Sequence, residues 1–501
     1  MKYFKYIFFS AVLIGFTACS EDDYDYNPSP DPLPELTAGV ADFSNFVALG
    51  NSLTAGYADG SLYKIAQENS MPKIMANQFS LVGGGDFTQP LTNDNIGGLL
   101  AGGSQLPGFA PRFWLNLDPD PNVEGENPAP QRLDAMPTTD IVLNNPTGPF
   151  NNLGVSGAKS FHLLAPGYGD LNGLFTMPAT ANPYFVRMAS SPTTSVIADA
   201  MAQAPSFFSL WIGNNDVLGY ALSGGDGTDP ITDQATFDFV YSTLISTLTS
   251  AGAQGVVANI PDVTAVPFFT TVPYNPVPLD EATAGALNQG YALYNGGLQQ
   301  AFAALAGTGL FTEEEVAART INFSAGAGNA LVIIDESLTD LGAINPAFAG
   351  IPQYRQATAA DLFVLTLSSL IPQGYGTQIP LEDKYTLTPE EQLEIKMATD
   401  AFNATIQAQA SGANLAFVDA NTLLNQLKEG NLPSGDFSLT SGFISGGAFS
   451  LDGFHPNSRG YALLANQFLK AIDVAYGSNF DASGNLVNLG NYPTNYSPLL
   501  Q

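Results

Sequence analysis

The chain has 501 residues, of which 45% are hydrophobic and 11% aromatic, so it can bury one large core or two ordinary ones, and disorder over most of its length is excluded. Its 46 acidic residues outnumber its 15 basic residues, and the resulting net charge of −31 argues against nucleic acid as a partner. One cysteine cannot form an internal disulfide, and two histidines leave little room for a histidine-rich metal site.

Residues 1–18 have the organisation of a secretion signal. Two lysines precede an apolar run that ends at Ala18, and this run is shorter than the roughly 20 residues that a membrane-spanning helix needs. Cys19 follows directly. This arrangement resembles the lipobox of bacterial lipoproteins, in which the cysteine is acylated and becomes the first mature residue; the alternative is an incidental thiol in an ordinary signal peptide.

Residues 19–36 are predicted to form a flexible tether. The segment is rich in acidic residues and proline and has no apolar period. The acidic residues just after Cys19 resemble the export signal of some Gram-negative surface lipoproteins. We therefore expect a protein held at the outer membrane or cell surface by the lipid on Cys19.

Residues 37–501 are predicted to form a single α/β domain. Short apolar runs alternate with helical patterns, which favours a three-layer sandwich with a central parallel sheet and a site at the carboxyl ends of its strands. The predicted strands are 46–49, 152–155, 207–212, 255–260 and 415–418, and the predicted helices are 234–251, 281–306, 389–410 and 459–476.

The 50 glycines and 35 prolines indicate long insertions in this domain. We expect one at about 58–150, as a long decorated loop, and one at about 262–388. The second contains an apolar patch, 362–371, for which core packing is expected and a lid over the site is the alternative. Residues after about 476 are expected to form a polar surface tail.

Ser52 lies where the first predicted strand gives way to a helix, in Gly50-Asn51-Ser52-Leu53. A helix amino terminus offers free backbone N–H groups and a partial positive charge, and both stabilise an anionic tetrahedral intermediate. The alternative is a serine that only caps the helix.

Asp452 precedes His455 by three residues. A carboxylate at this spacing on a turn can reach the imidazole Nδ1–H, fix the tautomer and leave Nε2 to take a proton from a hydroxyl. A chance placement of the two residues is the alternative.

Two further segments follow predicted strands. In Gly213-Asn214-Asn215-Asp216 the Asn215 amide can donate to an oxyanion, and in Val155-Ser156-Gly157-Ala158 the glycine lets a backbone N–H approach the substrate. The alternatives are a helix cap at Asn215 and a plain turn at Gly157.

In this order, the four segments resemble the blocks of the SGNH or GDSL family of serine hydrolases, which have a flavodoxin-like fold. The resemblance implies that Ser52 is the nucleophile, that His455 is the general base and then acid, and that Asp452 orients His455. It also implies an oxyanion hole formed by the backbone N–H groups of Ser52 and Gly157 and the Asn215 side chain, with no metal or cofactor. Asn51 replaces the aspartate that usually precedes the nucleophile, and the amide should preserve hydrogen bonding.

His162 has no matching role and is expected to be structural. The acidic loops 118–126 and 226–233 are expected to be solvated, because their spacing does not match an EF-hand. The absence of a Gly-x-Ser-x-Gly motif around Ser52 argues against an ordinary α/β-hydrolase.

The sequence thus predicts a secreted, lipid-anchored serine esterase that acts on a small-molecule, lipid or glycan ester. The abundant aromatic residues and the patch at 362–371 favour an acyl-chain pocket and a lipase-like substrate. A carbohydrate O-deacetylase is the first alternative, and a surface binding lipoprotein without catalytic activity is the second. The oligomeric state is not predicted.

Overall fold

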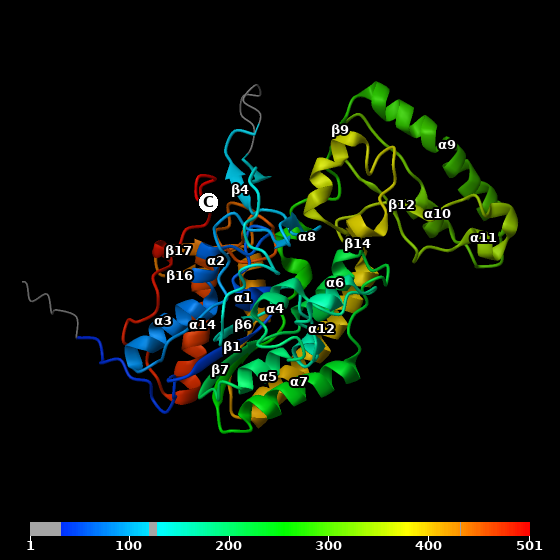
Figure 1. The fold of residues 1–501 in the computed structure, drawn as a ribbon. Coiled ribbons are helices and arrows are strands. Elements are labelled where there is room, and N and C mark those ends of the chain that lie inside the picture. Colours follow the sequence, from blue (N-terminus) through cyan, green and yellow to red (C-terminus); the bar gives the residue numbers. More distant parts are fainter. Residues whose placement is uncertain (1–31, 120–127, 431) are drawn as a thin grey trace, which may run out of the picture.

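The structure is a computed structural model that describes residues 32–119, 128–430 and 432–501. Cys19, the predicted signal segment and most of the predicted tether lie outside these ranges. Five parallel strands form a central sheet in the order β15-β8-β7-β1-β6 (Figure 1). The predicted strands are confirmed as β1 (Phe46–Gly50), β6 (Asn152–Gly154), β7 (Phe207–Trp211), β8 (Gln254–Ala258) and β15 (Ala416–Val418).

Helices cover both faces of this sheet, as a three-layer α/β arrangement requires. On one face α14 packs against α3 and lies over β15 and β8, and on the other face α7 packs against α5 and α12 (Figure 1). The predicted helices are confirmed as α7 (Gln234–Thr249), α9 (Glu281–Ala304), α12 (Pro389–Gly412) and α14 (Ser458–Tyr476). The other elements of this body are α1 (Ser52–Ala55), α4 (Pro183–Met188), α5 (Val196–Met201), α6 (Asn214–Leu222), α13 (Ala420–Lys428), β16 (Leu432–Ser434) and β17 (Phe437–Leu439).

The local sequence explains these elements. Every residue of β1 and β7 is buried, as expected for parallel strands with helices on both faces. The α14 helix begins at the Asn457 cap, whose side chain accepts a hydrogen bond from the Gly460 N–H, and ends at Gly477 in the left-handed conformation. Within the described ranges, no helix combines the length and apolar character needed to cross a membrane.

The first insertion is more ordered than predicted, and the expectation of a decorated loop is wrong for its first part. Met71, Ile74, Met75 and Phe79 lie on one face of α3 and are buried in the main core. The elements of this insertion are α2 (Lys64–Glu68), α3 (Met71–Phe79), β2 (Leu100–Ala101), β3 (Ser104–Gln105), β4 (Phe113–Asn116) and β5 (Ala129–Arg132).

The second insertion contains a lobe that extends from the sheet, with α9 along its outer side (Figure 1). The lobe has two small hydrophobic clusters of its own. In the patch 362–371, by contrast, Phe363, Val364 and Leu367 are buried in the main core, which confirms core packing. The elements are α8 (Pro267–Thr270), β9 (Val277–Leu279), α10 (Glu313–Arg319), β10 (Gly326–Asn329), β11 (Val332–Ile334), α11 (Leu341–Ile344), β12 (Tyr354–Gln356), β13 (Leu362–Phe363) and β14 (Thr386–Leu387).

The segment after α14 is not the polar surface tail that the composition predicts. Phe480 and Leu489 are buried in the main core. Residues 496–500 hold a buried guanidinium from the first insertion, because Arg112 donates hydrogen bonds to the carbonyl oxygens of Tyr496, Ser497 and Leu500. The segment is therefore part of the folded body.

Candidate active site

Ser52 lies at the sharp turn at which β1 gives way to α1. The Asn51 side chain caps the helix by accepting a hydrogen bond from the Leu53 backbone N–H at 3.0 Å. The turn requires Gly50, because a Cβ there would lie 2.4 Å from the Trp211 carbonyl oxygen on the neighbouring strand. Ser52 is thus the first helical residue, where the backbone N–H has no partner within the helix.

Asn51 also ties the turn that carries Ser52 to the third predicted block. Its Nδ2 donates to Asn214 Oδ1 at 3.1 Å, and both side chains are buried. Asn214 begins α6, the helix that carries Asn215. The Asn51 amide thus forms hydrogen bonds both to the start of α1 and to α6.

Asp452 and His455 form the contact that their spacing predicts. Asp452 Oδ2 lies 2.9 Å from His455 Nδ1, and Oδ1 accepts hydrogen bonds from the backbone N–H groups of Phe454 and His455. Burial disfavours the charged carboxylate, but His455 and these hydrogen bonds outweigh it and lower the pKa of Asp452 to about 2. The ionised carboxylate accepts a hydrogen bond from Nδ1–H, so Nε2 is left as the basic nitrogen.

Contacts from the segment that follows α1 hold the Asp452–His455 pair in place. The Gly60 N–H donates to Asp452 Oδ2 at 2.9 Å, and the Tyr57 ring lies 4.6 Å from the His455 ring, measured between centroids. Tyr461, near the start of α14, donates from its hydroxyl to the Tyr57 carbonyl oxygen at 2.7 Å. The segment that follows α1 thus contacts both members of the pair.

Asp59 is a buried carboxylate behind this pair that the sequence analysis missed. Its Oδ1 accepts a hydrogen bond from the Leu451 N–H at 3.0 Å, and its own N–H donates to Ser450 Oγ at 3.0 Å. Tyr63 donates its hydroxyl to Oδ2 at 2.5 Å. Asp59 therefore clamps the loop that carries Asp452. The Asp-Gly dipeptide signals a turn at this point, but nothing in the sequence links that turn to residues 450–455.

The clamp predicts a distinctive pH dependence of stability. Burial raises the pKa of Asp59 to about 6, against the opposing effect of the Tyr63 hydrogen bond. Because the folded pKa lies above the ordinary 3.8, folding favours the protonated form, and stability is lost as the pH rises through about 6. The Asp59→Asn variant cannot ionise. From pH 4 to pH 8 the unfolding free energy of the wild type should therefore fall by about 2–3 kcal/mol relative to that of Asp59→Asn.

Urea unfolding of the two proteins at several pH values measures this difference. The comparison concerns the change with pH, so a constant offset from the altered Tyr63 contact does not affect it. Parallel stability curves would contradict the assignment of a buried, titrating carboxyl to Asp59.

Gly157 lies on the loop that follows β6, and Asn215 lies in the first turn of α6, directly after β7; β6 and β7 are the two neighbours of β1 in the sheet. Gly157 is exposed and has a φ of 83°, a conformation that favours glycine. Asn215 donates one amide hydrogen to the Ala158 carbonyl oxygen at 2.8 Å, which orients the side chain and leaves its second hydrogen available. Asp216 accepts hydrogen bonds from the N–H and hydroxyl of Ser160, which ties the start of α6 to the segment after Gly157.

The structure thus brings the predicted site residues to one end of the sheet. Ser52, Gly157 and Asn215 follow adjacent strands, and the Asp452–His455 pair is attached to the segment after α1. Within the residues that the structure describes, no hydrogen bond joins the hydroxyl of Ser52, which is 8% exposed, to His455. Such bonds are often long before substrate binds and tighten in the reacting complex.

His162 is structural, as expected. Its Nδ1 accepts a hydrogen bond from the Lys159 N–H at 2.9 Å, and its ring stacks on Tyr168 with centroids 4.6 Å apart. Burial and the Lys159 charge lower the pKa of His162 to about 4, so the ring is neutral at pH 7.

The acidic loop 226–233 uses its carboxylates locally. Asp226 accepts hydrogen bonds from Thr228, Asp229 pairs with Lys159, and Asp233 caps α7. Most of the loop 118–126 lies outside the described residues. In the described ranges, no group of three or more His, Cys, Asp or Glu side chains is placed to hold a metal ion.

No protein-family model, curated protein or solved structure matches the chain.

Proposed function

We propose that the protein is a serine ester hydrolase of the SGNH type. The observation that carries the proposal is the ionised Asp452 carboxylate on His455 Nδ1, held beside the strand end that presents Ser52. Acyl transfer requires a base with a fixed tautomer, a nucleophilic hydroxyl and donors for the oxyanion. The candidate site offers His455 as the base, Ser52 at a helix start as the hydroxyl, and two neighbouring oxyanion donors. The four sequence blocks and the parallel sheet support the family assignment.

In the proposed reaction, Ser52 Oγ attacks the ester carbonyl carbon while His455 Nε2 takes the hydroxyl proton. Asp452 stabilises the imidazolium that forms. The oxyanion accepts hydrogen bonds from the backbone N–H groups of Ser52 and Gly157 and from the Asn215 amide. His455 then gives the proton to the departing alcohol, and water, activated by the same imidazole, hydrolyses the acyl-enzyme.

A serine-directed fluorophosphonate tests this proposal directly. We expect one label per chain, on the peptide that contains Ser52, with parallel loss of para-nitrophenyl ester hydrolysis. A label on another residue, or hydrolysis that persists after complete labelling, would argue against Ser52 as the nucleophile.

We also propose that a lipid on Cys19 anchors the mature protein at the outer membrane or cell surface. The apolar run before Cys19 and the acidic residues after it support this location. Cells fed radiolabelled palmitate should label the wild type and not the Cys19→Ala variant. Equal labelling of both proteins would disprove lipidation at this residue.

A further inference from the structure

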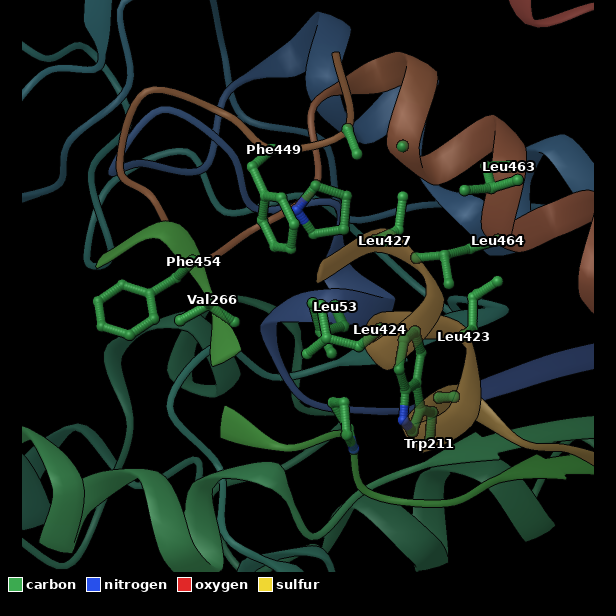
Figure 2. A pocket seen from close by; sticks show the side chains of 15 residues that line it. Leu53, Trp211, Val266, Leu423, Leu424, Leu427, Phe449, Phe454, Leu463 and Leu464 are labelled. Atoms are coloured by element: carbon green, nitrogen blue, oxygen red, sulfur yellow. The ribbon is translucent and has the colours of Figure 1, made fainter. Parts of the chain in front are cut away.

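An apolar pocket lies beside the candidate site, between α13, α14 and the end of β7 (Figure 2). Leu53 of α1 lies near the centre of the view, with Phe449 above it and Trp211 below it (Figure 2). The residues that line the pocket are Leu53, Trp211, Pro261, Val266, Ala420, Leu423, Leu424, Leu427, Ala448, Phe449, Phe454, Pro456, Gly460, Leu463 and Leu464.

The lining places this apolar pocket next to the reacting groups. Leu53 directly follows Ser52 in the chain, and Phe454 and Pro456 stand on either side of His455. An ester whose carbonyl carbon lies at Ser52 therefore has one of its substituents at the mouth of the pocket.

The chemistry of the lining determines which substituent of the ester the pocket can hold. No charged side chain and no hydroxyl group belongs to it among the described residues. Its one polar side-chain group, Trp211 Nε1, already donates to the Asn259 carbonyl oxygen at 3.0 Å. Leu424 and Leu427 of α13 line the pocket and are otherwise almost fully buried, each 6% exposed. A sugar ring would lose its hydrogen bonds in such a lining, whereas an aliphatic chain gains by its burial.

We infer that the apolar pocket holds the acyl chain of a fatty-acyl ester, an inference that rests on the proposed function. When Ser52 Oγ bonds to the carbonyl carbon and the bond to the alcohol oxygen breaks, the acyl chain stays in the pocket. The alcohol takes the proton from His455 and leaves. The preferred substrates are then esters of aliphatic acids, and acetylated glycans are not.

Chain-length preference tests this inference. With para-nitrophenyl esters, kcat/KM for octanoate should exceed that for acetate by about a hundred-fold, because each buried methylene adds to transition-state binding. Leu427→Trp should fill the pocket and abolish the preference while acetate is still hydrolysed. Leu293→Trp is the matched control, because Leu293 is 91% exposed on α9. Leu424→Trp repeats the test if Leu427→Trp does not fold.

A second series keeps the acyl group constant and varies the alcohol. If the rate follows the length of the alcohol and not that of the acyl chain, the pocket holds the leaving group and the inference is wrong. Equal rates for acetate and octanoate would also overturn it and would leave the proposed hydrolase activity intact.

Binding without turnover separates failure of the pocket from failure of the proposed function. The chain has two tryptophans, so in the Ser52→Ala, Trp114→Phe double variant Trp211 is the sole indole. Added dodecanoate should change the Trp211 emission, and Leu427→Trp should block competition by dodecanoate in ester hydrolysis. Binding with no hydrolysis of any ester would support the pocket and overturn the hydrolase. Ester hydrolysis without dodecanoate binding would support the hydrolase and overturn the acyl pocket.

Discussion

Replacing Ser52 with alanine is expected to lower kcat/KM for an activated ester by on the order of 10³-fold or more. The variant keeps the α1 turn, because the cap is made by Asn51, and it keeps the backbone N–H at position 52. Only the oxygen that would form the acyl-enzyme is removed. Any residual rate would reflect binding and oxyanion stabilisation without covalent catalysis.

Initial rates with para-nitrophenyl butyrate measure the effect. Ser209→Ala is the matched control, because its hydroxyl is buried on β7 and lacks a hydrogen-bond partner within the described chain. It removes the same atom from the core and should leave the rate within a few-fold. If Ser52→Ala and Ser209→Ala had equal activity, the nucleophile would have to be another residue.

Replacing Asp452 with asparagine should lower kcat by about 10³–10⁴-fold, as expected when a triad loses its anionic partner. The carboxylate accepts the His455 Nδ1–H as well as the N–H groups of Gly60, Phe454 and His455. An amide offers one oxygen to these four donors. The imidazole is then free to adopt the other tautomer, in which Nε2 carries the proton and cannot act as a base.

Asp473→Asn provides the control, because Asp473 also accepts two backbone N–H groups, from Phe480 and Asp481, and the Ser478 hydroxyl. It lies near the end of α14 and should alter stability without altering kcat. Thermal unfolding of both variants separates the two effects. Near-wild-type kcat in a folded Asp452→Asn protein would exclude the proposed role of this carboxylate.

The pH profile gives a second test of Asp452. Since its pKa is lowered to about 2, the carboxylate remains ionised in any assay above about pH 4. Its contribution to stability is likewise present above that range and is lost only as the pH falls through the pKa. Ionisation of Asp452 should therefore contribute no limb to the pH profile of kcat above about pH 4.

The sequence predicted the central sheet well because its strands are short, mostly apolar runs that are followed by Gly, Asn or Asp. It failed for α3, since the apolar residues at Met71, Ile74 and Met75 follow the helical period but stand in a stretch dominated by Gly, Pro and Asn. It failed again after α14, where Phe480 stands among polar residues and Leu486, Val487 and Leu489 form only a short apolar group. Such short stretches show no clear period, so their burial depends on tertiary contacts.

In the candidate site, too, the short-range contacts were predictable from the sequence and the long-range contacts were not. The Asp452–His455 contact spans three residues and was predictable from spacing. The Gly60 and Asp59 contacts to the same loop span 392 residues, and no local pattern encodes them. The inferred acyl pocket could not be predicted from the sequence, because the leucines of α13 show the ordinary spacing of a core-facing helix. The run 362–371 gave the stronger apolar signal, and its residues Phe363, Val364 and Leu367 lie in the core.

Arg112 makes the candidate site depend on the far end of the chain. Its guanidinium is fully buried, and three of the carbonyl groups that accept its hydrogen bonds lie 384 to 388 positions further along. A buried cation without these acceptors is costly. Arg112 also lies over the ring of Tyr63, which donates its hydroxyl to Asp59. Removal of residues 496–500 would therefore leave a buried charge short of acceptors beside the residues that hold the loop at 450–455.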